Sequence, residues 1–173
     1  PFVNRPGARA AIYTWGNRNA YGLAYHPETG ELWESEIGPL GGDEINVLQP
    51  GRNYGWPFVS SGRNYTGTPV SDKPWTREGM EDPRMVWVPS ISPSGLTFYT
   101  GDRFPNWKGN AFVGALGFRL LARLELDGER VRVEERLLDD MSQRIRAVVQ
   151  GPDGCIYLLT DESDGRIMRI EPV

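Results

Sequence analysis

The sequence predicts an all-β chain built from repeated sheets, and three observations favour this fold class. The 173 residues include 21 Gly and 14 Pro, which indicates many turns between short elements. Aromatic residues make up 11% of the chain, and aromatic side chains are enriched in strands. No segment shows the spacing of apolar residues that an amphipathic helix requires.

Before a long loop, the sequence predicts four strands. Residues 10–15 form an expected entering strand, and residues 22–25 and 31–35 form an expected hairpin around a turn with Pro and Gly. Residues 44–48 alternate polar and apolar side chains, as a half-buried strand does. The stretch 51–84 is rich in Gly, Pro and Asn and is expected to be a long loop that its aromatic side chains keep ordered.

Strands resume after this loop and continue to the end of the chain. The turn Asp127-Gly128, between two alternating segments, is a typical hairpin signal. The expected strands are residues 85–88, 95–99, 110–115, 120–126, 131–135, 145–150, 155–160 and 166–171.

Two segments of the chain share one pattern. GLAYHPETGELWESE (22–36) and AVVQGPDGCIYLLTDE (147–162) each give an apolar strand, a turn with Pro and Gly, a second apolar strand and an acidic exit, and residues 95–116 are a looser copy. Self-similarity with about four strands per unit predicts the blades of a β-propeller, each of about 40–50 residues. The chain therefore supplies about three blades. A small β-sandwich is the alternative.

Residues 1–173 are expected to form a single domain that is part of a propeller. Closed propellers need at least about four blades, more than this length supplies. The chain begins at Pro1 and shows no signal peptide, so we expect a processed chain or an excised fragment. Because open blades expose sheet edges, we expect a partner: the remaining half of the propeller or another copy of this chain.

Composition excludes several classes of partner. The net charge is −4, with acidic and basic residues interspersed, so no nucleic-acid or anionic-membrane surface is expected. No apolar run approaches the roughly 18 residues of a membrane span. The single cysteine, Cys155, lies in an apolar run and is expected to be a buried, inert thiol.

Several spaced motifs carry a resemblance to one family. They are GNRNAYGLAYHP (16–27), EIGPLGGDEIN (36–46), GRNYGWP (51–57), PSISPSGLTFYTGDRFPNWKGNAFVGAL (89–116), RLELDGERV (123–131) and QRIRAVVQGPDGCIYLLTDESDGRIMRIEP (143–172). In this order, the set resembles the soluble quinoprotein sugar dehydrogenases, the glucose/sorbosone and aldose sugar dehydrogenases.

The resemblance implies a fold and an activity. The fold is a six-bladed propeller that binds pyrroloquinoline quinone (PQQ) and Ca²⁺, with this chain as its C-terminal half. The implied activity is oxidation of an aldose sugar at C1 to the lactone, with an external electron acceptor. The implied location is periplasmic or secreted.

The resemblance also implies cofactor contacts from two cationic segments. Arg18 and Asn19 match the family's Arg-Asn cofactor pair, and Arg144 and Arg146 match its second arginine pair. The chemistry is suitable because PQQ carries three carboxylates and Arg pairs bidentately with carboxylates. Two residues apart on a strand, Arg144 and Arg146 are expected on one face. Without the resemblance, that spacing is typical of a solvated strand face.

Metal ligands are implied in the glycine-rich acidic loop. The carbonyls of Gly38 and Pro39 match the family's contacts to the cofactor-bound calcium, so both count as cofactor and metal residues. Glu44 and the carbonyl of Tyr54 match a neighbouring structural calcium, and Asp43 is expected as a supporting acceptor. Calcium takes six to eight oxygen ligands, often including backbone carbonyls. Without the resemblance, the loop is a surface turn with solvated acids.

No catalytic residue is expected in this chain. His26 is the only histidine, and oxidation of a sugar hydroxyl needs a general base. However, His26 precedes Pro27 in a turn, where an exposed polar side chain is expected. The resemblance implies that the catalytic histidine lies in the N-terminal half, so this chain alone is expected to be inactive.

Some positions depart from the family pattern. Tyr21 replaces a Gln, Gly117 replaces a Lys that contacts the quinone, and Ala147 replaces an Asp. Val88 and Ser90 replace a Trp and a Thr. We expect weaker quinone binding, with Arg119 as a compensating cation. Two other functions stay open: a calcium-stabilised propeller binding module without redox chemistry, and a half-propeller that pairs with another chain.

Overall fold

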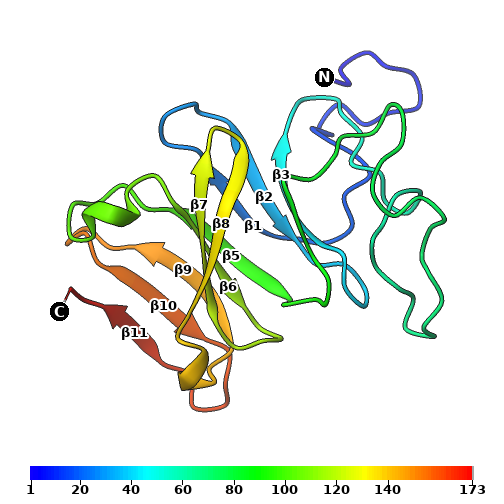
Figure 1. Cartoon of the computed structure of the whole chain (residues 1–173). Coiled ribbons are helices and arrows are strands. Elements are labelled where there is room, and N and C mark those ends of the chain that lie inside the picture. Colours follow the sequence, from blue (N-terminus) through cyan, green and yellow to red (C-terminus); the bar gives the residue numbers. More distant parts are fainter. Residues whose placement is uncertain (173) are drawn as a thin grey trace.

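The protein consists of three antiparallel sheets (Figure 1), described here from a computed structural model that covers residues 1–172. The first sheet contains β1 (Ala20–Tyr25), β2 (Leu32–Glu36), β3 (Asp43–Leu48) and β4 (Met85–Trp87), in that order. The second contains β5 (Pro93–Phe98), β6 (Ala111–Ala115), β7 (Leu121–Asp127) and β8 (Arg130–Leu137), and the third contains β9 (Ile145–Gln150), β10 (Ile156–Thr160) and β11 (Ile167–Ile170).

The near absence of helices from residues 1–172 confirms the all-β prediction. Within residues 1–172 the only helices are two short 3₁₀ turns, Pro105–Trp107 and Asp139–Met141. No helix in this part of the chain is long and apolar enough to cross a membrane.

The first strands of the three sheets lie side by side, β1 against β5 and β5 against β9. Glycines permit this close approach. A Cβ at Gly22 would lie 2.6 Å from the backbone nitrogen of Leu96, and a Cβ at Gly95 would lie 3.1 Å from the Cα of Ala147. The sheets therefore fan out from a common line of inner strands.

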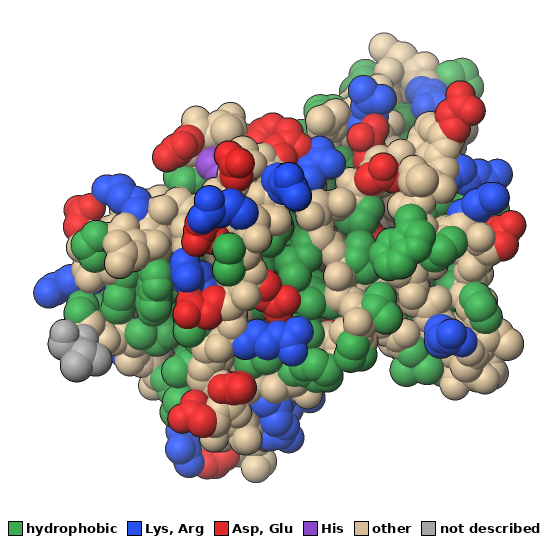
Figure 2. Space-filling view, viewed as in Figure 1, with side chains coloured by type: hydrophobic (Ala, Val, Ile, Leu, Met, Phe, Trp, Pro, Cys, Tyr) green, Lys and Arg blue, Asp and Glu red, His purple; other side chains and the backbone are tan. Residues whose placement is uncertain are grey.

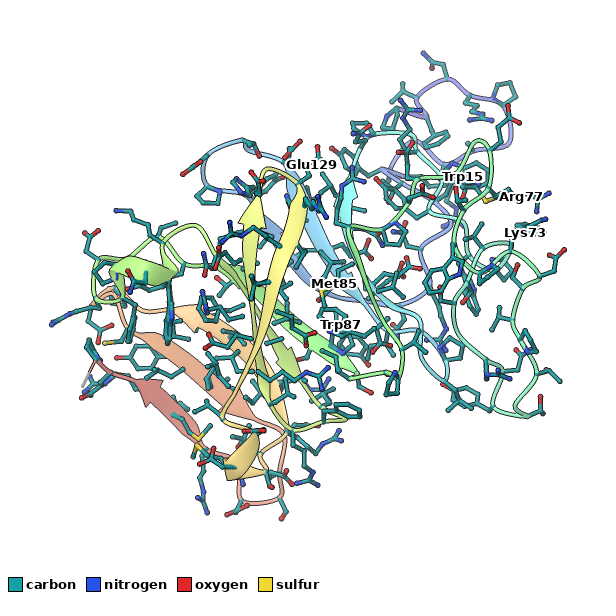
Figure 3. The ribbon with its side chains drawn as sticks, in the orientation of Figure 1. Trp15, Lys73, Arg77, Met85, Trp87 and Glu129 are labelled. Atoms are coloured by element: carbon teal, nitrogen blue, oxygen red, sulfur yellow. The ribbon has the colours of Figure 1, made fainter. Side chains whose placement is uncertain are left out.

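Apolar side chains fill the two spaces between neighbouring sheets. Trp33, Ile45 and Trp87 belong to a buried cluster between the first and second sheets, and Figure 3 shows Met85 and Trp87 there. The indole Nε1 of Trp87 also donates to Glu134 in β8 over 3.2 Å. A second cluster, between the second and third sheets, contains Tyr99, Phe112, Leu121, Ile145, Val148, Ile156 and Leu158.

The two outermost sheet faces remain open and carry apolar side chains. Leu23 and Tyr25 on β1 are 58% and 70% exposed. At the other end of the stack, Val149 on β9 and Ile167 on β11 are exposed. Elsewhere, acidic and basic side chains are interspersed over the face that Figure 2 shows.

The segment before β4 confirms one prediction and corrects another. Residues 51–84 contain no strand, as predicted, and lie beyond β3 (Figure 1). The strand predicted at 10–15 is wrong, because only Trp15 forms an isolated bridge, with Asn53. Tyr13 and Trp15 are exposed, so no buried face stabilises an extended strand there.

Candidate functional site

The residues predicted to bind cofactor and metal lie mostly at one end of the sheets. Ala20 pairs with Glu36, and Ile145 pairs with Thr160, so the segments beside these residues share that end. We call this end the rim. It comprises residues 16–19, 36–44, 88–92, 116–120, 138–146 and 160–166.

A small cavity at the rim brings together four predicted residues. Arg18, Gly38, Glu44 and Tyr54 line it, together with Glu36 and neighbouring residues. The cavity volume available to the centre of a water molecule is about 10 Å³. This is room for about one water or ion. These residues therefore surround a site of ionic size.

Glu36 links the Arg-Asn pair to β3, a role that the sequence analysis missed. Its Oε2 accepts hydrogen bonds from the backbone nitrogens of Arg18 over 2.5 Å and Asn19 over 3.1 Å. Its Oε1 accepts from the Asn46 side chain over 3.1 Å. The chain therefore enters β1 in a fixed conformation.

Contacts with Ile37, Trp56 and Tyr65 orient the Arg18 guanidinium, the last through a hydrogen bond from Nη2 to the Tyr65 hydroxyl over 3.5 Å. Its Nη1 donates to the Ile37 carbonyl over 2.6 Å, and its carbon lies 5.2 Å from the centroid of the Trp56 ring, within cation–π range. Trp56 comes from the NYGWP motif, so this motif supports the predicted cofactor pair. The side chain of Asn19 is exposed to solvent.

Asp43 organises the Gly38 loop rather than standing solvated at the surface. Its carboxylate is fully buried and accepts from the Gly38 nitrogen over 2.9 Å, the Ser90 hydroxyl over 2.7 Å and the Ser92 nitrogen over 3.0 Å. Burial raises its pKa, and the hydrogen bonds oppose that rise. Ser90, one of the departures from the family pattern, therefore has a structural role here.

Three carboxylates crowd beside the cavity on one face of the first sheet. Burial, followed by repulsion from Glu36, raises the pKa of Glu34 and of Glu44 to about 8. Burial also raises the pKa of Glu36. Next to them, the Oδ1 of the buried Asn46 has no hydrogen-bond partner within the described residues. At neutral pH these pKa values leave Glu34 and Glu44 mostly protonated, so a cation bound beside them would favour their ionised forms.

Arg144 and Arg146 converge on one carboxylate, Asp161. The Oδ2 of Asp161 accepts from Nη2 of each arginine over 2.9 Å. The Arg146 guanidinium also lies 5.5 Å from the centroid of the Tyr21 ring. Because Tyr21 is in β1, this contact connects the second arginine pair to the segment that carries Arg18 and Asn19.

The acidic exits of the two sequence repeats have the same role. Glu162 accepts from the Arg144 backbone nitrogen over 3.2 Å, as Glu36 does from Arg18. Both pairs are 18 residues apart. The acidic exits are visible in the sequence repeat, which is the signal that could have identified their shared role.

Arg119 does not present a free cation for the quinone. Its Nη1 donates to the Ser142 carbonyl over 2.8 Å and pairs with Glu162 over 3.0 Å. These contacts do not support the compensating role expected for Arg119 beside Gly117.

The expectation that His26 is exposed is wrong. It is 9% exposed and packs against Phe98 with a ring-centroid distance of 4.9 Å. Its Nδ1 accepts from the backbone nitrogens of Glu28 and Thr29, each over 3.3 Å. The turn after β1 folds the ring inward, at the end of the sheet opposite the rim. Cys155 is buried and free, as predicted.

We expect His26→Ala to destabilise the protein without weakening a cofactor at the rim. The loss of the buried ring's packing against Phe98 and of the acceptor for two backbone nitrogens costs about 1–3 kcal/mol of unfolding free energy. Urea unfolding and a PQQ titration of the same variant measure the two effects. A loss of quinone affinity at unchanged stability would contradict this structural role.

Comparison with known proteins identifies the family. The model of the family described as Glucose / Sorbosone dehydrogenase matches residues 1–169. The chain belongs to the glucose/sorbosone dehydrogenase family. Aldose sugar dehydrogenase YliI of Escherichia coli (strain K12) is 43% identical over 173 residues, which cover 99% of this chain and 47% of that protein.

Solved structures of glucose and aldose sugar dehydrogenases confirm the fold. A glucose dehydrogenase crystal structure is 46% identical, with a TM-score of 0.97 over 100% of this chain and 50% of that one. The PQQ-bound aldose sugar dehydrogenase of Streptomyces coelicolor is 26% identical, with a TM-score of 0.70 over 96% of this chain and 48% of that one. The three sheets are therefore blades of a propeller. The chain spans about half the length of these relatives.

Proposed function

We propose that this glucose/sorbosone dehydrogenase chain contributes the rim of a PQQ- and Ca²⁺-dependent enzyme that oxidises aldose sugars at C1 to the lactone. The observation that carries the proposal is the cavity that joins Arg18, Gly38, Glu44 and Tyr54. Arg146 contacts Tyr21, which follows Arg18 by three positions in the chain. The PQQ-bound relative supports the choice of cofactor.

The cationic residues suit a ligand with several carboxylates. Arg18, just before β1, and Arg146, in β9, present guanidinium groups that each contact an aromatic ring. Guanidinium groups bind carboxylates through paired hydrogen bonds. Arg18, Asn19, Gly38, Pro39, Arg144 and Arg146 are the residues that we propose for the PQQ site.

The acidic side of the rim suits a calcium ion. Within residues 1–172, no group of three or more His, Cys, Asp or Glu side chains is arranged to hold a metal. A calcium site here would therefore draw on backbone carbonyls, which Ca²⁺ accepts readily. Glu36 and Glu44 both line the cavity, and burial followed by repulsion from Glu36 raises the pKa of Glu44, so a cation bound there would favour its ionised form. We propose Glu44 and the Tyr54 carbonyl for one ion, and the Gly38 and Pro39 carbonyls for another.

When bound, PQQ supplies the acceptor for the two electrons that leave the sugar C1. This chain's residues would bind and orient the cofactor and exclude water from it. We propose a histidine outside this chain as the base for the C1 hydroxyl proton, because the single histidine here lies at the end of the sheet opposite the rim. We propose that further blades supply it and pack on the apolar faces that carry Tyr25 and Ile167. The external acceptor and a periplasmic or secreted location stay predictions.

An activity assay tests the proposal. The full-length protein, reconstituted with PQQ and Ca²⁺, is expected to oxidise aldoses with an artificial dye as electron acceptor, and chelation of Ca²⁺ before reconstitution should prevent it. If PQQ binds and no aldose is oxidised at saturating cofactor, a binding module without redox chemistry is the better description.

Glu44→Gln tests the calcium site directly. A ligand at a hundredfold excess over its Kd stabilises a protein by about 2.7 kcal/mol, and we expect this variant to lose most of that Ca²⁺-dependent stabilisation. With chelator, its melting temperature should equal or exceed that of the wild type, because the substitution removes a carboxyl group whose ionisation is disfavoured by burial and by Glu36. Glu28→Gln, an exposed residue at the opposite end, is the matched control. Equal losses with Ca²⁺ and with chelator would remove the metal role of Glu44.

A further inference from the structure

Arg144 and Arg146 are alike in sequence, but the structure gives them different contacts. Arg144 donates from Nε and Nη2 to Asp161 Oδ2 over 3.3 and 2.9 Å, and from Nη1 to the Leu116 carbonyl over 3.2 Å. The side chain of Arg146 makes a single hydrogen bond within the described residues, from Nη2 to the same Asp161 oxygen. Because a guanidinium has five N–H donors, Arg146 keeps most of its donors for a ligand.

Tyr21 restrains Arg146 from a different sheet. The guanidinium lies 5.5 Å from the centroid of the Tyr21 ring, within the range of cation–π attraction. Immobilising a long side chain on binding costs about 0.5–1.5 kcal/mol. Because a ring and a carboxylate already hold the Arg146 guanidinium, this side chain loses less conformational entropy when a ligand binds.

We propose that Asp161 and Tyr21 are positioning residues that hold the Arg146 guanidinium toward a carboxylate ligand, while Arg144 serves to anchor Asp161. The inference rests on the proposed function for the identity of the ligand, PQQ. It refines the sequence expectation that both arginines belong to the cofactor site, because Arg144 acts there through Asp161. It also gives Tyr21, a departure from the family pattern, a role in the site.

The charges of this cluster fit an anionic ligand. Two guanidinium groups and one carboxylate leave a net charge of +1, and the adjacent Arg119–Glu162 pair is neutral. Hydrogen bonds from Arg144 and then Arg146 hold the pKa of Asp161 below its ordinary value, so Asp161 is ionised at neutral pH. A ligand carboxylate can therefore bind the remaining donors of Arg146 while Asp161 stays in place.

Lysine substitutions distinguish the proposed roles of Arg144 and Arg146. PQQ is titrated with Ca²⁺ into the full-length protein and followed by quenching of tryptophan fluorescence, and melting temperatures are measured without PQQ. We expect Arg146→Lys to weaken PQQ binding about tenfold or more at an unchanged melting temperature. Arg144→Lys should lower the melting temperature by about 2–4 °C and change affinity much less. Arg166→Lys, an exposed residue paired with Asp164, is the control. Equal effects of Arg144→Lys and Arg146→Lys on affinity would overturn the division of roles.

Asp161→Asn distinguishes positioning from simple charge. The substitution raises the net positive charge, so an electrostatic account alone predicts tighter binding of the anion. The positioning role predicts binding that is about three- to tenfold weaker, because the guanidinium is no longer oriented. Tighter binding by Asp161→Asn would overturn the role of Asp161, and unchanged binding by Tyr21→Leu would overturn that of Tyr21.

NMR of the arginine side chains tests the positioning roles of Asp161 and Tyr21 independently of whether the protein binds PQQ. Without PQQ, Asp161→Asn should shift or broaden the Nε–H signals of both arginines, and Tyr21→Leu should affect Arg146 alone. If the wild type does not bind PQQ, the proposed cofactor is wrong, and these signals still decide whether Asp161 and Tyr21 orient Arg146. An Arg146 signal that is unchanged in both variants would refute the positioning role.

Discussion

Asp43→Ala is expected to lower the free energy of unfolding by about 3 kcal/mol or more, because each buried donor left without a partner costs about 1–3 kcal/mol. Asp43 is fully buried, and its carboxylate holds the Gly38 and Ser92 nitrogens and the Ser90 hydroxyl. Its loss therefore releases the Gly38 loop from the segment that follows β4. Urea unfolding with chelator present measures this effect without a contribution from calcium.

A surface aspartate provides the comparison for Asp43. Asp72→Ala, at an exposed position in the loop before β4, should change stability by no more than about 0.5 kcal/mol. If Asp43→Ala were equally mild, Asp43 could not be the residue that organises the rim.

Gly38→Ala is the second substitution with a large expected effect. A Cβ at this position would collide with the carbonyl oxygen of Gly41 and lie 2.5 Å from that of Gly42. Both neighbours are backbone atoms, so the loop must move, at a cost of about 1–3 kcal/mol. Because we propose the Gly38 carbonyl as a calcium ligand, PQQ affinity with Ca²⁺ should also fall about tenfold or more.

Gly165→Ala is the matched control for Gly38→Ala. A Cβ at Gly165 would make an ordinary contact, 3.5 Å from the Glu162 carbonyl oxygen, so neither stability nor quinone affinity should change much. A Gly38→Ala variant that binds PQQ and Ca²⁺ as the wild type does would show that the conformation of this loop does not matter for the site.

Local patterns were sufficient to predict the sheets. The repeat that relates residues 22–36 to 147–162 identified two blades, and alternation located β7 and β8 correctly. The failure at residues 10–15 has a physical reason. An apolar segment forms a strand only where a neighbouring strand can pair with it, and the sequence alone does not show which segments become neighbours. In the described residues this segment pairs only through the single bridge from Trp15 to Asn53.

The candidate site was harder to predict because its contacts cross between sheets. The resemblance pointed to Arg18, Gly38, Glu44 and Tyr54, which the structure brings to one cavity. Spacing alone did not show that Arg146 and Tyr21 meet, since they are 125 positions apart, 146 minus 21. The inward turn of His26 was equally hidden, because it depends on packing against Phe98 from another sheet.

The acidic residues at the end of β2 and just after β10 are visible in the sequence repeat, but the repeat alone does not show what they bind. Glu36 and Glu162 each bind the backbone nitrogen of an arginine 18 residues earlier. Strand pairing explains this repeat, because the end of the second strand of a blade lies beside the start of its first strand. An acid at the exit of one strand can therefore fix the entry of the other.

The most direct test of this account is an anaerobic absorbance measurement on the full-length protein loaded with PQQ and Ca²⁺, with no external electron acceptor. On addition of an aldose, the account predicts that the absorbance of the oxidised cofactor disappears in proportion to the protein present and that lactone forms in equal amount. A cofactor spectrum that the sugar leaves unchanged, in protein shown to hold PQQ, would contradict it.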